Sequence, residues 1–208
     1  MSDAVLRAIH EARAVAILRA GDADVASAAL DAAVRGGFRV LEVTTSTPRV
    51  LDHIARLAAD PRLTIGAGTV LTVAQARDCA AAGARFLVSP VTDPEVITEA
   101  ARLGCVAIPG AHTPTELWLA HRAGAPLQKL FPAPAGGPDW LRSVLAPMPF
   151  LRVIPTNGVD EANAAAWLAA GAYAVGMVRS LFAPEDLAAR AYDRVEARAR
   201  AMLAAIAN

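Results

Sequence analysis

Short apolar runs alternate with longer, alanine-rich segments along most of the chain. Five of the runs begin at a glycine that ends a helical pattern, where a helix C-terminus favours a residue with positive φ; the segments are Gly37–Val43, Gly83–Ser89, Gly104–Pro109, Gly124–Phe131 and Gly171–Gly176. Three further runs lack that glycine, namely Val15–Leu18, Leu63–Gly68 and Leu151–Ile154. Each run is too short for a helix and is typical of a buried parallel strand.

The spacing of the runs predicts eight strands, each followed by a helix. The strands begin near residues 15, 39, 64, 85, 106, 127, 151 and 173, roughly 21 to 25 residues apart. Eight such units favour an α/β fold, a (β/α)8 TIM barrel, with an extra N-terminal helix over residues 3–13. No linker or low-complexity segment divides the chain, so residues 1–208 are predicted to form a single (β/α)8 barrel domain. An open doubly wound sheet is the alternative, and it more often has six strands and a glycine-rich first turn.

Prolines mark three of the predicted helix starts. A side chain that can cap a helix precedes a proline in Thr47–Pro48, Asp93–Pro94 and Thr113–Pro114. Threonine and aspartate oxygens accept hydrogen bonds from the first N–H groups of a helix, and proline fits the first helical position. We therefore expect helices to begin at these three points.

Composition restricts the partners and the location of the protein. Hydrophobic residues make up 55% and charged residues 19% of the 208 residues, and the 20 basic and 20 acidic side chains cancel. A neutral balance predicts no binding to nucleic acid or to an anionic membrane. Met1–Ala20 does not have the pattern of a signal peptide, and no segment is apolar enough to predict a membrane span, so we expect a cytoplasmic protein. The two cysteines, Cys79 and Cys105, are interpreted as small buried residues.

The most informative feature of the composition is the use of lysine. Of the 20 basic residues, 19 are arginine, and the single lysine is Lys129 inside the apolar run Leu127–Phe131. A bias toward arginine and alanine tends to replace surface lysines. A lysine that persists in an apolar run therefore calls for a chemical explanation.

Charged residues within or at the end of predicted strands are the candidates for chemistry, because the active site of this barrel lies at the C-terminal ends of its strands. Three residues qualify, namely Arg19, Glu42 and Lys129. Burial disfavours the ammonium form of a lysine and frees its amine to attack a carbonyl, while a buried carboxylate can transfer protons. The alternative is a structural ion pair of Glu42 with Lys129 or Arg19, or a side chain that points out between the helices.

Two other patterns are less specific. Gly66–Thr69 combines two glycines, which would let a substrate approach the backbone, with a hydroxyl, but a tight turn with a helix cap has the same pattern. The four histidines have no metal-ligand spacing, so no metal site is predicted.

From about Val15 to Phe182 the chain resembles the 2-keto-3-deoxy-6-phosphogluconate (KDPG) aldolases, which are also known as 4-hydroxy-2-oxoglutarate aldolases. The matching motifs are Ile17–Arg19, Leu41–Thr44, Ile65–Val70, Pro109–Gly110 with Thr113–Glu116, and Lys129–Pro132. The resemblance implies a homotrimeric class I aldolase that needs no metal or other cofactor and splits a 2-oxo acid into pyruvate and an aldehyde. It also implies that Lys129 is the Schiff-base lysine, that Glu42 is the proton shuttle, and that Arg19 and Thr69 hold the substrate carboxylate. Pro132 belongs to the lysine motif and is predicted to contact the substrate.

The resemblance weakens where the family binds phosphate. Many members have Thr-Gly-Gly after the seventh strand and Gly-Ser after the eighth, whereas this chain has Thr156-Asn157-Gly158 and Val178-Arg179. Small residues leave backbone amides open to phosphate, so Asn157 and Val178 argue against such a cradle. We predict that Thr156, Asn157, Gly158 and Arg179 bind the distal end of the substrate, although Arg179 could instead lie on the surface or at a subunit contact. Whether that end carries a phosphate, the identity of the aldehyde and the configuration at C4 stay open.

Three functions are therefore compared. The first is a class I lyase that cleaves a 2-keto-3-deoxy sugar acid, with or without a 6-phosphate, or a 4-hydroxy-2-oxo acid. The second is a phosphate-binding barrel isomerase or synthase in which Lys129 acts only through its charge. The third is a non-catalytic barrel that binds sugar acids and uses Glu42 and Lys129 as a structural pair. The lone lysine, together with Glu42 and Thr69, favours the first.

Overall fold

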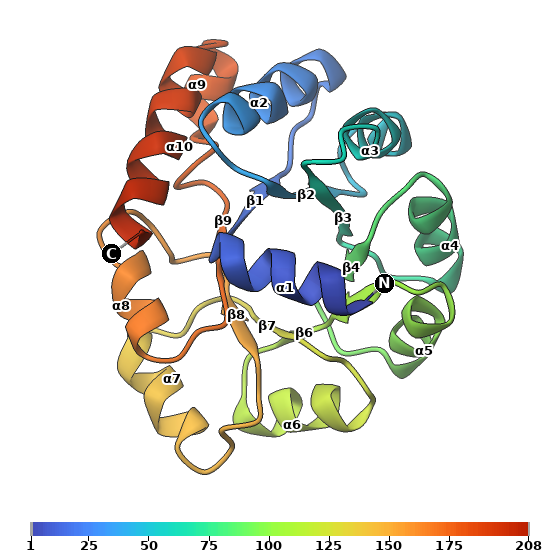
Figure 1. The fold of residues 1–208 in the computed structure, drawn as a ribbon, viewed down its shortest axis with the longest axis vertical. Coiled ribbons are helices and arrows are strands. Elements are labelled where there is room, and N and C mark those ends of the chain that lie inside the picture. Colours follow the sequence, from blue (N-terminus) through green and yellow to red (C-terminus); the bar gives the residue numbers. More distant parts are fainter. Residues whose placement is uncertain (1, 208) are drawn as a thin grey trace.

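The computed structural model describes residues 2–207, which form nine strand segments and ten helices, most of them in alternation (Figure 1). The strands are β1 Ala14–Leu18, β2 Val40–Thr44, β3 Thr64–Gly68, β4 Phe86–Val88, β5 Val106–Ile108, β6 Gly110–Ala111, β7 Gln128–Leu130, β8 Val153–Pro155 and β9 Val175–Met177. The helices are α1 Ser2–Ala12, α2 Ala23–Arg35, α3 Val50–Ala58, α4 Val73–Ala81, α5 Pro94–Arg102, α6 Pro114–Arg122, α7 Gly137–Leu145, α8 Ala164–Ala169, α9 Pro184–Ala188 and α10 Tyr192–Ile206. Every predicted strand is confirmed within about two residues of its expected start, and so is the N-terminal helix.

The glycines that precede five of the strands have the predicted backbone conformation. Their φ angles are +112° at Gly37, +111° at Gly83, +72° at Gly104, +93° at Gly124 and +101° at Gly171. A side chain is strained in this region, so glycine ends the helix and turns the chain into the next strand.

The expectation of one continuous eight-stranded barrel sheet is only partly met. All strand pairs are parallel, and they form a six-stranded sheet in the order β5-β4-β3-β2-β1-β9 and a three-stranded sheet in the order β6-β7-β8. The predicted fifth strand is divided into β5 and β6 at Pro109, which has no N–H to donate to a neighbour. β5 pairs with β4 and β6 pairs with β7, so this divided strand contacts both sheets.

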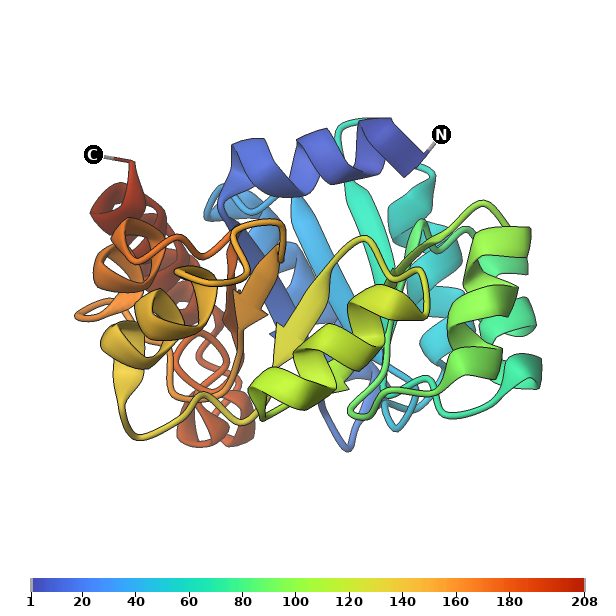
Figure 2. The same ribbon diagram turned by 90° about the horizontal axis from the view of Figure 1, so that it is seen from below.

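Side chains on the two faces of the strands belong to two different apolar clusters. Leu18, Leu41 and Val43 belong to the larger cluster, which also contains residues of the surrounding helices. Ile17, Phe86 and further strand residues form a second cluster with Val5 and Ile9 of α1. Since side chains point to opposite faces along a strand, the sheets have an outer face against the helices and an inner face. Figures 1 and 2 show α1 lying across the ends at which the strands begin, so the inner face is closed there and the opposite end is left for a site.

Threonine and aspartate caps fix most of the predicted helix starts. Asp93 caps α5, and Thr113 forms a complete capping box with Glu116 at the start of α6, as predicted. The prediction at Thr47–Pro48 is wrong, because α3 begins at Val50 after Arg49, whose φ is +58°.

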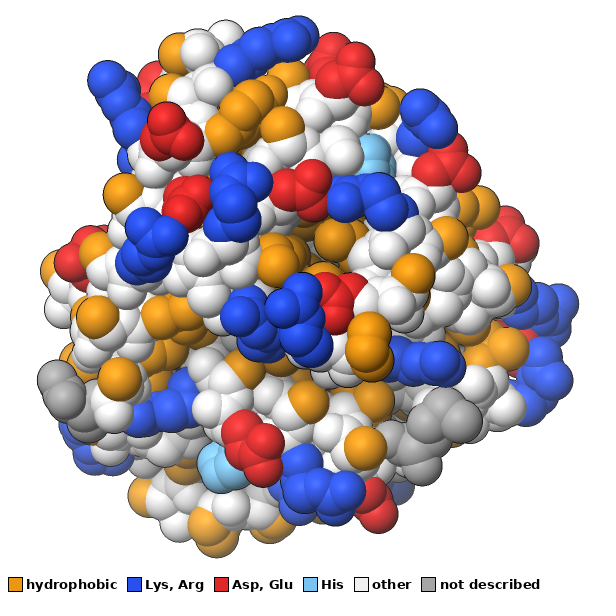
Figure 3. Space-filling model, turned by 45° about the horizontal axis from the view of Figure 1, so that its top comes forward, with side chains coloured by type: hydrophobic (Ala, Val, Ile, Leu, Met, Phe, Trp, Pro, Cys, Tyr) orange, Lys and Arg blue, Asp and Glu red, His pale blue; other side chains and the backbone are white. Residues whose placement is uncertain are grey.

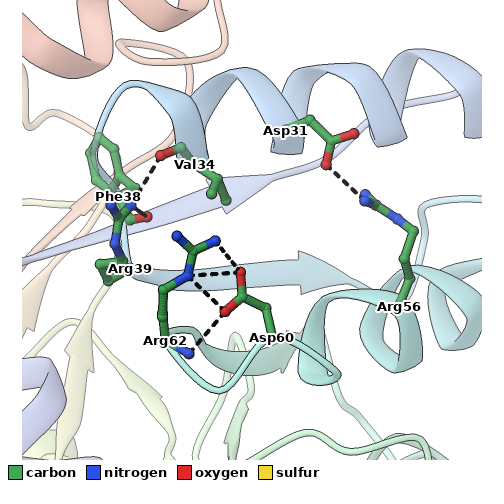
Figure 4. A network of polar contacts seen from close by, with 7 residues as sticks. All are labelled: Asp31, Val34, Phe38, Arg39, Arg56, Asp60 and Arg62. Carbon is green, nitrogen blue, oxygen red and sulfur yellow. Dashed lines mark hydrogen bonds and ion pairs between the residues drawn. The ribbon is translucent and has the colours of Figure 1, made fainter.

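Polar contacts at the surface join α2 to α3 and to the start of β2 (Figure 4). Arg39 Nη1 donates to the carbonyl oxygens of Val34 at 3.0 Å and Phe38 at 2.9 Å, so it links the end of α2 to the start of β2. Arg56 of α3 pairs with Asp31 of α2 at 2.8 Å. Exposed pairs of this kind contribute about 0–1 kcal/mol each, so this network supports the frame rather than a site.

Charged side chains of both signs share the surface. On the face in Figure 3, Lys and Arg side chains are interleaved with Asp and Glu, and neither sign dominates a region. Among residues 2–207, no helix has the length and apolar character needed to cross a bilayer.

Glu99→Gln tests a carboxyl group of the frame whose pKa is lowered by two arginines. Glu99 of α5 accepts hydrogen bonds from Arg102 at 2.6 Å and from Arg77 of α4 at 2.7 Å, and these bonds lower its pKa from 4.5 to about 2. A carboxyl whose pKa is lower in the folded state stabilises the fold above its unfolded pKa and loses that effect as the pH falls through the folded value. The wild type should therefore be more stable than Glu99→Gln at pH 7, and the difference should disappear between about pH 4.5 and 2.

Urea unfolding at several pH values measures this difference. Glu95→Gln is the matched control, because Glu95 lies exposed on the same helix and has no arginine partner among the residues that the structure describes. A difference that stays constant down to pH 2 would contradict the assignment.

Candidate functional site

A cavity of about 470 Å³ lies where the strands end, on the side opposite α1. Seven of the nine predicted site residues line it: Arg19, Glu42, Thr69, Lys129, Thr156, Asn157 and Arg179. The remaining lining residues are Ile17, Thr44, Pro90, Phe131, Val178, Phe182, Pro184 and Leu187. Pro132 and Gly158 do not line the cavity, although each directly follows a residue that does.

Lys129 and Glu42 reach each other from different sheets. Glu42 is on β2 of the six-stranded sheet, and Lys129 is on β7 of the three-stranded sheet. The Nζ atom of Lys129 lies 3.8 Å from Oε1 of Glu42, which is an ion-pair distance and too long for a hydrogen bond. Lys129 is 9% exposed and Glu42 2% exposed, and the ammonium also lies 5.3 Å from the centre of the Phe131 ring. An amine and a carboxylate are thus held together with little of either side chain exposed to solvent.

Burial controls the ionisation of Glu42. Desolvation raises the pKa of its carboxyl group, and the positive charges of Lys129 and Arg19 oppose that effect without cancelling it. Oε1 of Glu42 accepts no hydrogen bond from the described residues. A carboxyl group with a raised pKa and an unused acceptor holds a proton more readily than an exposed one, which suits it to proton transfer.

The two glycines of β3 provide space for neighbouring side chains, not the predicted space for a substrate. A Cβ atom on Gly66 would collide with the ring of Phe86, and a Cβ atom on Gly68 would collide with the carboxylate of Glu42. Gly68 pairs with Thr44 in the register of β2 and β3. The carboxylate of Glu42, two residues before Thr44 on β2, lies over the backbone of Gly68. Gly68 therefore determines where the Glu42 carboxylate can be.

Gly68→Ala should displace the Glu42 carboxylate without exposing the core. We expect turnover to fall by about 10²-fold, which is the cost of misplacing a reacting group by roughly 1 Å. Gly21→Ala is the control, because a Cβ atom on Gly21 meets nothing within 4 Å. Steady-state kinetics compares kcat of the two variants with that of the wild type. Full activity of Gly68→Ala would mean that Gly68 does not position Glu42.

One edge of the cavity presents a guanidinium and a hydroxyl. Nη2 of Arg19, just after β1, donates to Oγ1 of Thr69 at 3.1 Å. Thr69 has a φ of +59°, a conformation that non-glycine residues rarely adopt and that often persists at functional sites. The N–H and Oγ1 of Thr45 donate to the carbonyl oxygens of Gly68 and Thr69, both at 2.8 Å, which fixes this turn.

The segments after β8 and β9 form the other edge. Asn157 has a φ of +61° and Gly158 a φ of +112°, and the N–H of Ala133 lies 3.0 Å from the carbonyl oxygens of both Thr156 and Asn157. Arg179 is exposed at the cavity and has no hydrogen-bond or ion-pair partner among residues 2–207.

Several lining residues were not predicted. Thr44 is two residues after Glu42, and Phe131 two residues after Lys129, so period-two alternation along each strand would have placed them on the same face. Phe182, Pro184 and Leu187 come from the segment around α9 and carry no such signal.

No metal site accompanies this arrangement in the described part of the chain. Among residues 2–207 no group of three His, Cys, Asp or Glu side chains is placed to hold a metal ion. Cys79 and Cys105 are buried and free, and desolvation raises the pKa of both thiols, to about 11 for Cys79.

A buried amine beside a carboxylate, at the C-terminal ends of parallel strands, defines an α/β protein whose site has the functional groups of an enzyme. The family profile described as "KDPG and KHG aldolase" matches residues 5–198. The probable 2-dehydro-3-deoxy-6-phosphogalactonate aldolase of Rhizobium meliloti is 38% identical over 174 residues, which cover 82% of each chain. The KHG/KDPG aldolase of Escherichia coli is 39% identical over 175 residues, which cover 81% of this chain and 80% of the relative.

A solved structure agrees with these relatives. The KDPG aldolase of Legionella pneumophila, in which pyruvate was captured at low pH as a covalent carbinolamine, superposes with a TM-score of 0.85 at 28% identity and covers 97% of this chain and 98% of its own. The chain belongs to the KDPG and KHG aldolase family.

Proposed function

We propose that this protein is a class I aldolase that reversibly cleaves a 2-keto-3-deoxy sugar acid or a 4-hydroxy-2-oxo acid into pyruvate and an aldehyde. The observation that carries the proposal is the single lysine of the chain, buried at the cavity 3.8 Å from the carboxylate of Glu42. Membership of the aldolase family supports it, as does the covalent pyruvate carbinolamine of the Legionella relative.

In the proposed reaction the amine of Lys129 attacks the C2 ketone of the substrate. The carbinolamine loses water to give an iminium, which accepts the electron pair of the C3–C4 bond when the C4 hydroxyl gives up its proton. The aldehyde leaves, the resulting enamine is protonated at C3, and water hydrolyses the new iminium to free pyruvate and the lysine. Glu42, acting through a water molecule, moves protons in the carbinolamine step and at the C4 hydroxyl. The iminium is the electron sink, so this scheme uses no metal or cofactor.

Two ends of the cavity are assigned to two ends of the substrate. Arg19 and Thr69, whose Nη2 and Oγ1 atoms are 3.1 Å apart, hold the C1 carboxylate. Thr156, Asn157 and Arg179 hold the distal end, because they line the cavity after β8 and β9. Pro132 and Gly158 are left out of the proposed binding set, since neither lines the cavity.

A retro-aldol assay coupled to pyruvate detection tests the function. The substrates are 2-keto-3-deoxygluconate, its 6-phosphate and 4-hydroxy-2-oxoglutarate, and we expect pyruvate from at least one. Conversion of a substrate without release of pyruvate would favour an isomerase or synthase. Binding of these acids without any conversion would favour a sugar-acid binding protein with a structural Glu42–Lys129 pair.

We further infer that the two sheets close into one (β/α)8 barrel and that residues 1–208 form one domain. Thr156 and Gly176 form a parallel bridge between the ends of β8 and β9, and the N–H of Tyr173 donates to Val153 at 2.9 Å. The divided strand β5–β6 joins the sheets on the other side. A single cooperative unfolding transition is expected of such a unit.

We also propose a cytoplasmic homotrimer. Leu71, Val91 and Leu119 are each close to half exposed, and apolar side chains of this size fit a subunit contact. Light scattering should give the mass of three 21.5-kDa chains. A monomeric mass at micromolar concentration would contradict this assignment.

A further inference from the structure

The cavity has an apolar wall on the side of α9. Phe182 just before this helix, and Pro184 and Leu187 within it, line the cavity. None of these three side chains can donate or accept a hydrogen bond. The wall can therefore contact only the carbon chain of a substrate, and its distance from that chain depends on what holds α9 in place.

α9 buries little apolar surface of its own. Of its five residues, Pro184–Ala188, the one that is buried is Asp186, a carboxylate that is 2% exposed. Leu187 is only partly buried. An ionised carboxylate is unfavourable inside a protein unless it is paired, so the position of this short helix depends on the partners of Asp186.

The main partner of Asp186 is Arg198, which reaches both ends of the segment that carries the wall. Nη2 of Arg198 lies 2.5 Å from Oδ2 of Asp186, and Nη1 donates to the carbonyl oxygen of Leu181 at 2.8 Å. One guanidinium thus bridges residues 181 and 186, with part of the wall between them. Arg194 makes a longer contact with Asp186, at 3.3 Å, and its side chain is 74% exposed.

Arg198 belongs to a well-packed helix. Val195 and Ala199 of α10 are buried in the larger apolar cluster, and Figure 1 shows α10 beside both α9 and α2. Arg35 of α2 also pairs with Glu196 of α10 at 2.7 Å. The guanidinium of Arg198 therefore ties a segment with little packing of its own to a helix that is fixed in the core.

We infer that Arg198, acting through Asp186, is a positioning residue that holds the apolar wall of α9 against the carbon chain of the substrate beyond C3. The wall follows β9, on the edge to which the distal end of the substrate is assigned. The inference rests on the proposed aldolase function and concerns only the aldehyde half of the substrate. The pyruvate half, held by Lys129 and Arg19, does not depend on this wall.

The test compares two reactions at the same site. One is cleavage of whichever acid the wild type cleaves most efficiently among 2-keto-3-deoxygluconate, its 6-phosphate and 4-hydroxy-2-oxoglutarate. The other is trapping of pyruvate by borohydride, which uses the same lysine but has no carbon beyond C3. We expect Arg198→Gln to raise KM for cleavage by about tenfold or more with little change in kcat, because it removes a contact that the ground state and the transition state share. Its rate of pyruvate trapping should equal that of the wild type.

Leu187→Ala and the double variant show whether Arg198 acts through the wall. Leu187→Ala shortens the wall directly and should raise KM in the same way. Since displacing the wall and truncating it remove the same contact, the double variant should raise KM by less than the product of the two single effects. Arg198→Lys keeps the charge beside Asp186 but has one nitrogen for two acceptors. It should show a smaller rise in KM, and it carries the comparison if Arg198→Gln is too unstable to purify.

Arg200→Gln is the matched control, because Arg200 is an exposed arginine of the same helix that pairs with Glu196 and not with the segment around α9. It should change neither KM nor trapping. An unchanged KM in Arg198→Gln would overturn the inference. So would an equal loss of cleavage and trapping, or a double variant whose effect equals the product of the single ones. Failure of the aldolase proposal looks different, since the wild type would then trap no pyruvate and release none from the three acids.

Discussion

Lys129→Ala is expected to abolish both turnover and the covalent trapping of pyruvate by borohydride. Borohydride reduces the iminium formed between an amine and pyruvate, so each reacting chain should gain the mass of one reduced pyruvate adduct. Lys129 is the only lysine of the chain, which leaves the N-terminal amine as the only competing site. Intact-mass spectrometry followed by peptide mapping therefore assigns the adduct without ambiguity, and an unlabelled wild type would remove the Schiff-base mechanism.

Lys129→Arg separates the chemistry of the amine from its charge. The guanidinium keeps the positive charge beside Glu42 but is not a nucleophile at neutral pH. In an aldolase this variant should be as inactive as Lys129→Ala and should trap no pyruvate. In an isomerase or synthase that uses Lys129 only as a cation, it should retain substantial activity.

The periodic part of the fold was predictable because its signals are local. A glycine at positive φ ends a helix, and a short apolar run forms the next buried strand, as at Gly37 before β2 and Gly83 before β4. Thr47–Pro48 failed as a helix start because the Thr47 hydroxyl contacts other partners, Oγ1 of Thr44 at 3.2 Å and the N–H of Ala20 at 3.4 Å. Those partners come together only after β1 and β2 have paired.

The part of the site that could be predicted consists of charged residues in apolar strands, where burying an unpaired charge is unfavourable. A charge in an apolar strand needs a partner or a function, and this argument identified Glu42 and Lys129, which the structure brings to 3.8 Å. The role of Gly68 was predicted wrongly. The space beside this glycine is filled by the carboxylate of Glu42 from the neighbouring strand β2, and not by a substrate. Phe182 and Leu187 line the cavity through the path of the chain around α9, which no short pattern encodes.

Glu42→Gln is expected to lower kcat by about 10²–10⁴-fold while the protein stays folded. The amide keeps the shape of the side chain and cannot shuttle a proton. Burial raises the pKa of Glu42, so the wild-type rate should fall as the pH drops and this carboxylate becomes protonated. That acidic limb of the pH–rate profile should be absent from the residual activity of Glu42→Gln. Glu42→Asp, which keeps the carboxyl group on a shorter side chain, should recover part of the rate.

Stability distinguishes a proton shuttle from a structural ion pair at Glu42. A carboxyl group whose pKa is higher in the folded state lowers the stability of the fold as the pH rises above the unfolded pKa, and the loss is complete once the pH passes the folded pKa. Burial raises the pKa of Glu42, so this group costs stability at pH 7, and Glu42→Gln should unfold no more easily than the wild type. Breaking a stabilising buried pair would instead cost about 3–5 kcal/mol. Glu99→Gln is the comparison variant. It should lose stability and keep the wild-type kcat, because Glu99 and its two arginine partners lie outside the cavity. A Glu42→Gln variant that is strongly destabilised but retains most of its turnover would assign Glu42 to the frame of the protein instead of its chemistry.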